Sequence, residues 1–229
     1  MNIKNILKTI CLSALLSGSI AVSAQKAAKP IVTGADQTAV YLKMLKGKKV
    51  GFVGNQTSVM SDEKNTHVVD YLVSKGVNLV KVFAPEHGFR DMAAAGAKIS
   101  DGVDPVTGVP VVSLYGKNYK PSKEMLEDLD VIVYDIQDVG CRFYTYISTM
   151  AYVMEAAAEN GKKVIILDRP NPNGQYIDGN ILDTAYRSFV GMHPVPIVYG
   201  MTAGEYAKMV NGEGWLKNGV KCDLTVVPC

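Results

Sequence analysis

The 229-residue sequence has little net charge, few cysteines and none of the common cofactor motifs. Its 24 basic and 22 acidic residues give a formal charge of +2. The first 24 residues hold Lys4, Lys8 and no acid, so removing them leaves 22 basic against 22 acidic residues. A balanced chain offers no basic patch of the kind that nucleic-acid-binding proteins use. Nucleic acid is therefore not an expected partner.

Cysteine is scarce, and its placement argues against disulfide staples. Only Cys141, Cys222 and Cys229 follow residue 24. An exported chain can form disulfides, but an odd count leaves one thiol unpaired. Cys222 and Cys229 flank a predicted strand, whose two ends lie too far apart to be bridged. The sequence predicts no disulfide framework.

The motifs of nucleotide, metal and serine-hydrolase sites are also missing. No G-x-G-x-x-G follows a predicted strand and no Walker A sequence occurs, so no nucleotide cofactor is expected. His67, His87 and His193 are widely spaced and form no H-E-x-x-H pattern, so no metal is expected. No G-x-S-x-G nucleophile elbow is present.

An apolar targeting pattern stands at the start of the chain. Two lysines precede a small-residue apolar stretch that ends in Val22-Ser23-Ala24, which is typical of a cleaved secretory signal. No later run approaches about 20 apolar residues, so we expect no stable membrane insertion after cleavage. We expect an exported protein, periplasmic or secreted. The predicted parts are a signal peptide, a mobile leader and a folded domain, at residues 1–24, 25–37 and 38–229.

Short apolar runs alternate with helical patterns through the rest of the chain. Continuous apolar runs, rather than alternating ones, are typical of strands buried on both faces. Strand and helix in alternation predict an α/β fold with an open, mostly parallel sheet and helices on both faces. The predicted strands are 49–53, 79–84, 109–113, 131–134, 164–167, 196–198 and 224–227. The predicted helices are 66–75, 122–129, 144–160 and 203–210, with starts at Ser122 and Thr202 and stops at Gly76 and Gly161.

Polar side chains follow the predicted strands at the points where they end. In an open parallel sheet these ends meet at one edge, which is where ligands bind. Turn chemistry explains Gly, Pro, Asn and Asp at such points, but it does not call for Glu-His, Gln-Asp, Arg or Tyr. We therefore predict one composite pocket, with residues from six strand ends.

Glu86 is the sharpest local feature of these loops. It follows a buried strand and is flanked by Phe83, Pro85 and Phe89. Partial desolvation would raise the pKa of its carboxyl group and make it a usable general acid. A carboxylate that fixes the loop by accepting backbone N–H bonds is the other reading, and residue type alone leaves both open.

The loop after the fourth predicted strand contains several candidate groups. Asp135 and Asp138 can cap the following helix or act chemically, and Arg142 can pair with either. Tyr144 and Tyr146 can stack on a sugar ring or pack. Cys141 stands near a helix start, which favours a thiolate, and with His87 or His193 nearby it can serve as a nucleophile. A small residue in a tight loop is the favoured explanation of Cys141.

Five long motifs, in order, resemble one family of glycosidases, the NamZ-type exo-β-N-acetylmuramidases. The resemblance spans residues from about 40 to 229. The motifs are Ala84-Pro85-Glu86-His87-Gly88-Phe89-Arg90, Ser113-Leu114-Tyr115-Gly116, Asp135-Ile136-Gln137-Asp138-Val139-Gly140, Arg142-Phe143-Tyr144-Thr145-Tyr146 and Leu167-Asp168-Arg169-Pro170-Asn171-Pro172.

The resemblance implies a Rossmann-like domain that binds no nucleotide and removes terminal non-reducing N-acetylmuramic acid (MurNAc) from peptidoglycan fragments. It implies that Glu86 is the general acid/base and that peptidoglycan-derived MurNAc–GlcNAc saccharides are the partners. It also implies a smaller C-terminal domain whose motifs are not found here, so we expect the natural chain to continue. Where many members have R-H-G-M-T, this sequence has Val198-Tyr199-Gly200-Met201-Thr202, which leaves the role of Tyr199 open.

The resulting site prediction assigns a role to each group. His87 or Arg90 would tune Glu86, and Asp138 would be the second carboxylate. Arg142 or Arg169 would pair with the lactyl carboxylate of MurNAc. The catalytic candidates are Glu86, His87 and Asp138. The substrate-binding candidates are Asn55, Gln56, Arg90, Tyr115, Gln137, Arg142, Tyr144, Asp168, Arg169 and Asn171.

Two other functions compete with the glycosidase. One is an acyl hydrolase that depends on Cys141, which blocking the thiol would inactivate. The other is a non-catalytic module that binds wall sugars, which would hold MurNAc without turning over a glycoside.

Overall fold

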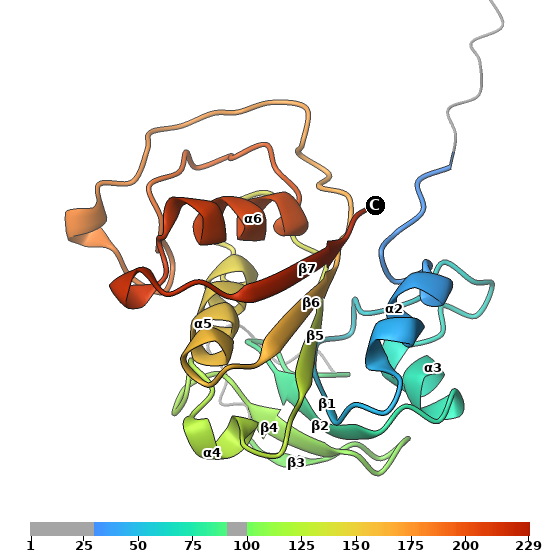
Figure 1. The fold of residues 1–229 in the computed structure, drawn as a ribbon. Helices are drawn as coiled ribbons and strands as arrows, with labels where there is room; N and C mark the ends of the chain where they lie inside the picture. Colours follow the sequence, from blue (N-terminus) through green and yellow to red (C-terminus); the bar gives the residue numbers. More distant parts are fainter. Residues whose placement is uncertain (1–29, 91–99) are drawn as a thin grey trace, which may run out of the picture. The chain divides into compact units, whose positions relative to one another are not determined.

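The computed structural model describes residues 30–90 and 100–229, which form a seven-stranded sheet (Figure 1). The predicted signal peptide and residues 25–29 of the predicted leader lie outside these ranges. The strand order is β3-β4-β2-β1-β5-β6-β7, with β3 antiparallel to β4 and every other neighbouring pair parallel. The strands are β1 Val50–Gly54, β2 Leu79–Ala84, β3 Gly102–Val103, β4 Pro110–Ser113, β5 Val131–Asp135, β6 Lys163–Leu167 and β7 Asp223–Val227. The predicted open, mostly parallel sheet is confirmed.

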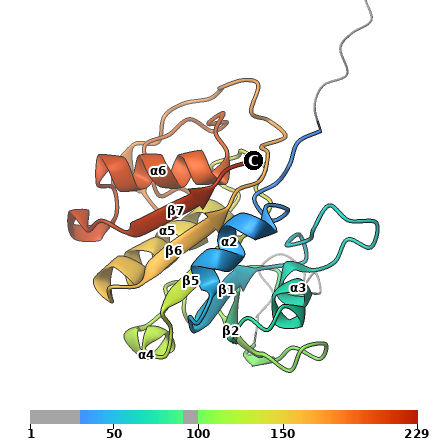
Figure 2. The same ribbon diagram turned by 45° about the vertical axis from the view of Figure 1, so that its right-hand side comes forward.

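Helices cover both faces of this sheet, as the two ribbon views show (Figures 1 and 2). The helices α2 Thr38–Leu45 and α3 Val68–Ser74 lie on one face, and α4 Lys123–Leu126, α5 Tyr146–Glu159 and α6 Ala203–Glu213 lie on the other. Each face has its own apolar core. Every residue of β1 and β5 is buried because both strands are covered on both sides, which explains their unbroken apolar runs.

The helix starts predicted at Ser122 and Thr202 and the helix ends predicted at Gly76 and Gly161 agree with the structure. Ser122 accepts a hydrogen bond from the amide of Met125, and Thr202 forms a capping box with Glu205. Gly76 and Gly161 adopt φ of 70° and 61° just past their helices, a backbone region that favours glycine.

Three elements differ from the prediction. Residues 196–198 are not a strand, because Pro194 and Pro196 lack the amide hydrogens that a ladder needs. Val198 forms only isolated bridges, to Cys141 and Asp178. The sequence analysis also missed α2 and the two-residue strand β3.

The predicted mobile leader is wrong for residues 33–37. The amide of Gly34 donates to the carbonyl of Asp168 at 2.8 Å, and Ala35 is fully buried. Thr33 and Asp36 hydrogen bond to each other, and Asp36 also accepts from the amide of Ser61. This segment is packed against the carboxyl end of β6.

Three further properties bear on function. In the described ranges no helix is long and apolar enough to span a bilayer, and no group of three metal-ligating side chains occurs. Cys141, Cys222 and Cys229 are free thiols.

Candidate functional site

The strand order of the sheet reverses between β1 and β5. The chain passes from β1 outward through β2 to β4 and then returns to β5 on the other side of β1. The carboxyl edge at such a reversal is where open α/β sheets bind ligands, and we call it the sheet crevice. The loops after β1 and β5, which were predicted to contribute to a composite pocket, both lie at this edge.

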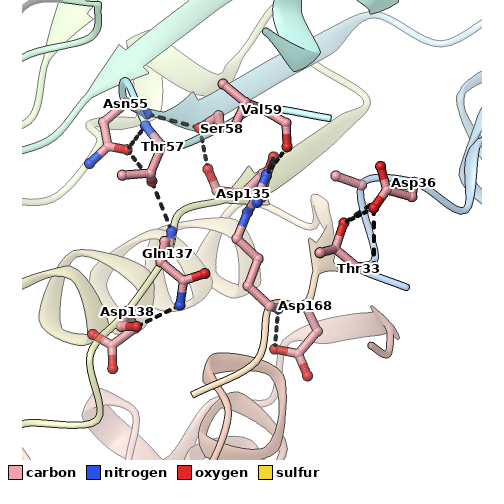
Figure 3. A network of polar contacts seen from close by, with 12 residues as sticks. Thr33, Asp36, Asn55, Thr57, Ser58, Val59, Asp135, Gln137, Asp138 and Asp168 are labelled. Carbon is pink, nitrogen blue, oxygen red and sulfur yellow. Dashed lines mark hydrogen bonds and ion pairs between the residues drawn. The ribbon is translucent and has the colours of Figure 1, made fainter. Parts of the chain in front are cut away.

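Hydrogen bonds connect the two loops across this crevice (Figure 3). Asn55 Oδ1 accepts from the amide and the hydroxyl of Thr57, at 2.9 and 2.6 Å. The hydroxyl oxygen of Thr57 accepts from the amide of Gln137 at 3.0 Å, and Gln137 Nε2 donates to the carbonyls of Asp138 and Pro170. These bonds hold Asn55, Gln137 and Asp138 in fixed positions along the edge.

Several buried polar atoms at this edge have no hydrogen-bond partner in the described part of the chain. They include Gln56 Oε1 and Asp138 Oδ1. Asn55 Nδ2 and the Tyr146 hydroxyl interact with each other but have no well-aligned partner. Asn55 is completely buried, and Tyr146 and Asp138 are 2% and 4% exposed. Because buried polar groups normally pair, an orphaned set of donors and acceptors points to a polar ligand or to bound water.

Glu86 lies half-buried directly after β2, beside the start of α5. Its Oε2 accepts a hydrogen bond from the hydroxyl of Thr145, the N-cap residue of α5, at 2.8 Å. A hydrogen bond with Glu86 raises the pKa of the Tyr115 hydroxyl. Burial raises the pKa of Tyr146, whose polar neighbours include Tyr144, Asn55 and Glu86. Glu86 therefore belongs to the same polar cluster as the orphaned atoms.

The backbone after Glu86 turns sharply. His87 adopts φ of 71°, which is unusual for a residue with a side chain, and Gly88 follows with φ of 93°. Two successive left-handed residues make a tight turn that fixes Glu86 at the strand end.

Asp138 is a buried carboxylate with neutral hydrogen-bond donors. Its Oδ2 accepts from the amide of Gly140 at 2.7 Å and from the hydroxyl of Tyr199. Burial raises the pKa of Asp138, and these two donors offset the rise only in part. Tyr199, which replaces a histidine of the family pattern, is therefore a direct partner of a predicted site residue.

The three predicted substrate or tuning arginines all bind protein groups. Arg90 forms ion pairs with Asp70 and Asp104, not with Glu86. Arg142 Nη1 donates to two backbone carbonyls, those of Asn180 and Val195, at 2.7 Å each. These contacts anchor the loop after β6.

Arg169 makes a buried two-point ion pair with Asp135. Its Nε and Nη2 lie 2.5 and 2.9 Å from the two carboxylate oxygens, and Nη2 also donates to the carbonyl of Val59. This pair ties β5 and β6 to the loop after β1. Arg169 thus has a different partner from the substrate carboxylate predicted for it.

Asp168 and Asn171 likewise hold the protein together. Asp168 accepts from the Thr202 hydroxyl and the Gly204 amide, which anchors the start of α6. Asn171 donates to the carbonyl of Met201 and accepts from the amide of Asn173. Both side chains position loops.

The sequence analysis missed four residues of this cluster. Thr57, Thr145 and Tyr199 were not predicted as site residues, and Tyr146 was considered only for stacking or packing. Thr145 and Tyr146 stand in a motif that the resemblance highlighted, which was the available signal. No sequence signal singled out Thr57, because its hydrogen bond with Gln137 forms only when β1 and β5 are neighbours.

Cys141 is half-buried, and its backbone bridges to Val198. His193, one of the two histidines considered as its base, instead contacts Tyr206 at 3.0 Å and stacks on Trp215.

The fold and the crevice define an α/β protein with a polar site at the carboxyl edge of its sheet. Comparison with known proteins shows the family to which the chain belongs. Residues 50–229 match the family described as "Exo-beta-N-acetylmuramidase NamZ, N-terminal", and the chain belongs to this family. The resemblance drawn from the motifs is confirmed.

The matched relatives are about twice as long as this chain. The chain is 49% identical over 207 residues to "Peptidoglycan beta-N-acetylmuramidase NamZ" of Bacillus subtilis (strain 168), covering 89% of the chain and 49% of the relative. Crystal structures of two DUF1343 family proteins of Bacteroides fragilis NCTC 9343 share 47% identity with it, with TM-scores of 0.76 and 0.77. Each match covers 86% of this chain and 51% or 50% of the other.

Proposed function

We propose that this chain belongs to a glycoside hydrolase that removes terminal, non-reducing β-linked MurNAc from peptidoglycan-derived MurNAc–GlcNAc saccharides. Family membership and the name of the B. subtilis relative support the reaction class. The observation that carries the proposal is the position of Glu86, half-buried at the crevice beside orphaned polar atoms. A carboxyl group placed there can reach a saccharide that the polar atoms hold.

In this proposal Glu86 is the general acid/base. It protonates the glycosidic oxygen as MurNAc leaves through an oxocarbenium-like transition state. The hydroxyls of Thr145 and Tyr115 hold the carboxyl group in place. We assign no tuning role to Arg90, because Asp70 and Asp104 bind its guanidinium group.

Asp138 is the proposed second carboxylate, as the base for water or as the nucleophile. Tyr199 and Gly140 fix one carboxylate oxygen and leave Oδ1 unpartnered among the described residues. A carboxylate with one fixed and one unpaired oxygen is suited to accept a proton or to attack a carbon.

Asn55, Gln56 and Tyr146 are the proposed saccharide ligands. Their buried amide and hydroxyl groups match the hydroxyl and acetamido groups of an N-acetylated sugar. For the lactyl carboxylate we keep Arg142, whose protein bonds use only Nη1 within the described residues. We do not keep Arg169, since its Nε and Nη2 bind protein oxygens.

Two measurements test this proposal, the hydrolysis of a MurNAc aryl glycoside and the binding of MurNAc. We expect release of the aryl group from a β-linked MurNAc aryl glycoside, and a loss of about 10²–10⁴-fold in kcat for Glu86→Gln. Glu63→Gln is the matched control, because Glu63 lies exposed in a loop. Alkylation of Cys141 should leave turnover unchanged.

Other outcomes would redirect the assignment. Normal turnover in Glu86→Gln would refute the role of Glu86. Binding of MurNAc without turnover would favour a wall-sugar binding module, and inactivation by thiol alkylation would favour the acyl hydrolase.

We also propose that the protein is exported, periplasmic or secreted, with cleavage after Ala24. The charged start, apolar stretch and small residues of segment 1–24 support this. The mature protein should then begin at Gln25, which N-terminal sequencing of the extracytoplasmic protein would establish. Retention of residues 1–24 would contradict it.

A further inference from the structure

A second cleft lies at the other end of α6, away from Glu86. It has a volume of about 440 Å³ and lies between the 3₁₀ turns Thr184–Tyr186 and Lys217–Gly219. These turns are the orange and red segments beside the C-terminal end of α6 in Figure 1. The helix begins near Asp168 at the sheet crevice and ends at this cleft. Its 11 residues separate the two places by about 16 Å.

The cleft carries positive charge and no lining carboxylate. Arg187 and Lys217 line it, and no aspartate or glutamate does. Neither side chain forms an ion pair within residues 30–90 and 100–229. Such a surface attracts anions.

An adjoining cleft of about 360 Å³ shares Arg187 and Lys217 and includes one carboxylate, Glu155. That carboxylate is already bonded. Its Oε1 pairs with the ammonium group of Lys120 at 2.6 Å, and its Oε2 accepts from the backbone amide of Lys217 at 2.7 Å. Glu155 therefore does not neutralise the side chains of Arg187 and Lys217.

An aromatic ring and a buried polar atom complete the lining. Trp215 is half-buried and stacks on His193, with ring centroids 5.7 Å apart and planes within 19°. His193 is 1% exposed, contacts the Tyr206 hydroxyl through Nδ1, and has no partner for Nε2 in the described structure. Burial and the charge of Arg187 lower the pKa of His193 to about 4, so the ring is neutral at pH 7.

We propose that this cleft is a second binding site for a carboxylate-bearing saccharide, separate from the crevice that contains Glu86. Arg187 and Lys217 bind the carboxylate, and Trp215 packs against the sugar ring. The volume is in the range of small-ligand sites and suits a short saccharide. The site has no role in bond cleavage and does not depend on the proposed reaction.

Tryptophan fluorescence tests this inference directly, because Trp215 is the single tryptophan of the 229-residue chain. We expect MurNAc to change the emission in a saturable way. Glucuronic acid should do the same if the carboxylate is the recognised group. N-acetylglucosamine, which lacks a carboxylate, should bind at least about tenfold more weakly.

Variants separate this cleft from the sheet crevice. The double variant Arg187→Gln/Lys217→Gln should weaken MurNAc binding about tenfold or more, whereas Lys43→Gln, an exposed lysine of α2, should not. Glu86→Gln should leave the titration unchanged. Equal affinity for MurNAc and N-acetylglucosamine, loss of the signal in Glu86→Gln, or no signal with any sugar would overturn the inference. Far-UV circular dichroism verifies that each variant is folded.

Discussion

Asp135, the last residue of β5, and Asp138, in the loop that follows, are two buried carboxylates with different electrostatic surroundings. Asp135 faces the guanidinium group of Arg169, which bonds both of its oxygens. Asp138 has neutral donors, which are the Tyr199 hydroxyl and the backbone amides of Val139 and Gly140. The ion pair of Asp135 ties β5 to β6. Asp138 has no cation partner in the described structure, so burial raises the pKa of its carboxyl group.

Breaking the Arg169–Asp135 pair should be costly. Arg169→Gln leaves Asp135 buried without a cation, so we expect a loss of about 3–5 kcal/mol in the free energy of unfolding. Lys163→Gln is the control, because the Lys163–Asp223 pair is 3.5 Å apart with side chains 41% and 69% exposed. That change should cost at most about 1 kcal/mol in urea denaturation. Equal losses for both variants would contradict this account.

Asp138 should make stability fall as pH rises. Burial raises its pKa in the folded state above the ordinary value of 3.8, so the folded state holds the proton more tightly than the unfolded chain. Its contribution is fully present below pH 3.8 and is lost as pH rises through the folded pKa. Relative to wild type, Asp138→Asn should therefore gain stability as pH rises from 3.8 through the folded pKa of Asp138.

Urea denaturation across that range measures the effect. The control is Asp223→Asn, which changes an exposed carboxylate. Its free energy of unfolding should vary with pH in the same way as that of the wild type. If the pH dependence of Asp138→Asn also matched that of the wild type, burial would not shift the pKa of the Asp138 carboxyl group.

At the scale of elements, α6 is bonded at both ends but has different amounts of space around its glycines. Its first turn binds Asp168 through Thr202 and the Gly204 amide, with the backbone close to the sheet. In its last turn the Asn211 side chain hydrogen bonds twice to the backbone of Cys222, yet there is open space around Gly212. The two glycines therefore lie in different packing environments within one helix.

Two alanine substitutions in α6 should have opposite effects. A Cβ added at Gly204 would lie 2.6 Å from Asp168 Cγ and 2.6 Å from Val226 Cγ1, so Gly204→Ala should destabilise by about 1–3 kcal/mol. Gly212→Ala meets nothing within 4 Å and should stabilise by about 0.5–1 kcal/mol, since alanine favours the helix. Thermal unfolding compares the two. If both substitutions destabilised the protein, the space around each glycine would not determine the effect of alanine in α6.

The elements also show where sequence patterns succeed. Residues 131–134 and 164–167 are continuous apolar runs, and both became central strands. Residues 196–198 look similar, but Pro196 and the nearby Pro194 prevent a ladder. The helix α2 was not predicted, although Tyr41 and Leu45 bury their side chains in the core. Continuous apolar runs therefore identified the central strands, whereas a short helix with only two buried residues gave no clear pattern.

At the scale of the whole molecule, the segment before α2 binds the opposite end of the chain. Gly34 donates to Asp168, and the side-chain amide of Gln37 hydrogen bonds to the carbonyl of Pro228. Residues nearly 200 positions apart are thus joined at the carboxyl edge of the sheet. The crevice is supported from a segment that the sequence analysis had assigned to a mobile leader.

Gly34→Ala should loosen this connection. The added Cβ would lie 2.4 Å from the amide nitrogen of Asp168 and 2.5 Å from the carbonyl oxygen of Val227. Because both contacts are backbone, we expect a loss of about 1–3 kcal/mol and faster amide exchange at residues 33–37. Gly102→Ala, where a Cβ meets nothing within 4 Å, is the control for hydrogen exchange and urea denaturation. Unchanged exchange in Gly34→Ala would show that the segment is held elsewhere.

The sequence by itself determined the fold class, the family and the loops that line the crevice. Apolar runs follow from burial on both sheet faces, and strand ends of a parallel sheet share one edge. These relations are local or topological, so they can be derived without coordinates. The family and the role predicted for Glu86 came instead from the resemblance of five motifs to a known family.

Only the tertiary structure decided which partner each polar side chain takes. Arg142 and Arg169 look alike as predicted ligands, yet one binds two carbonyls of a distant loop and the other binds Asp135. Tyr199 meets Asp138 across 61 residues. Such pairings depend on side-chain direction and on the packing of distant segments, which sequence spacing does not encode.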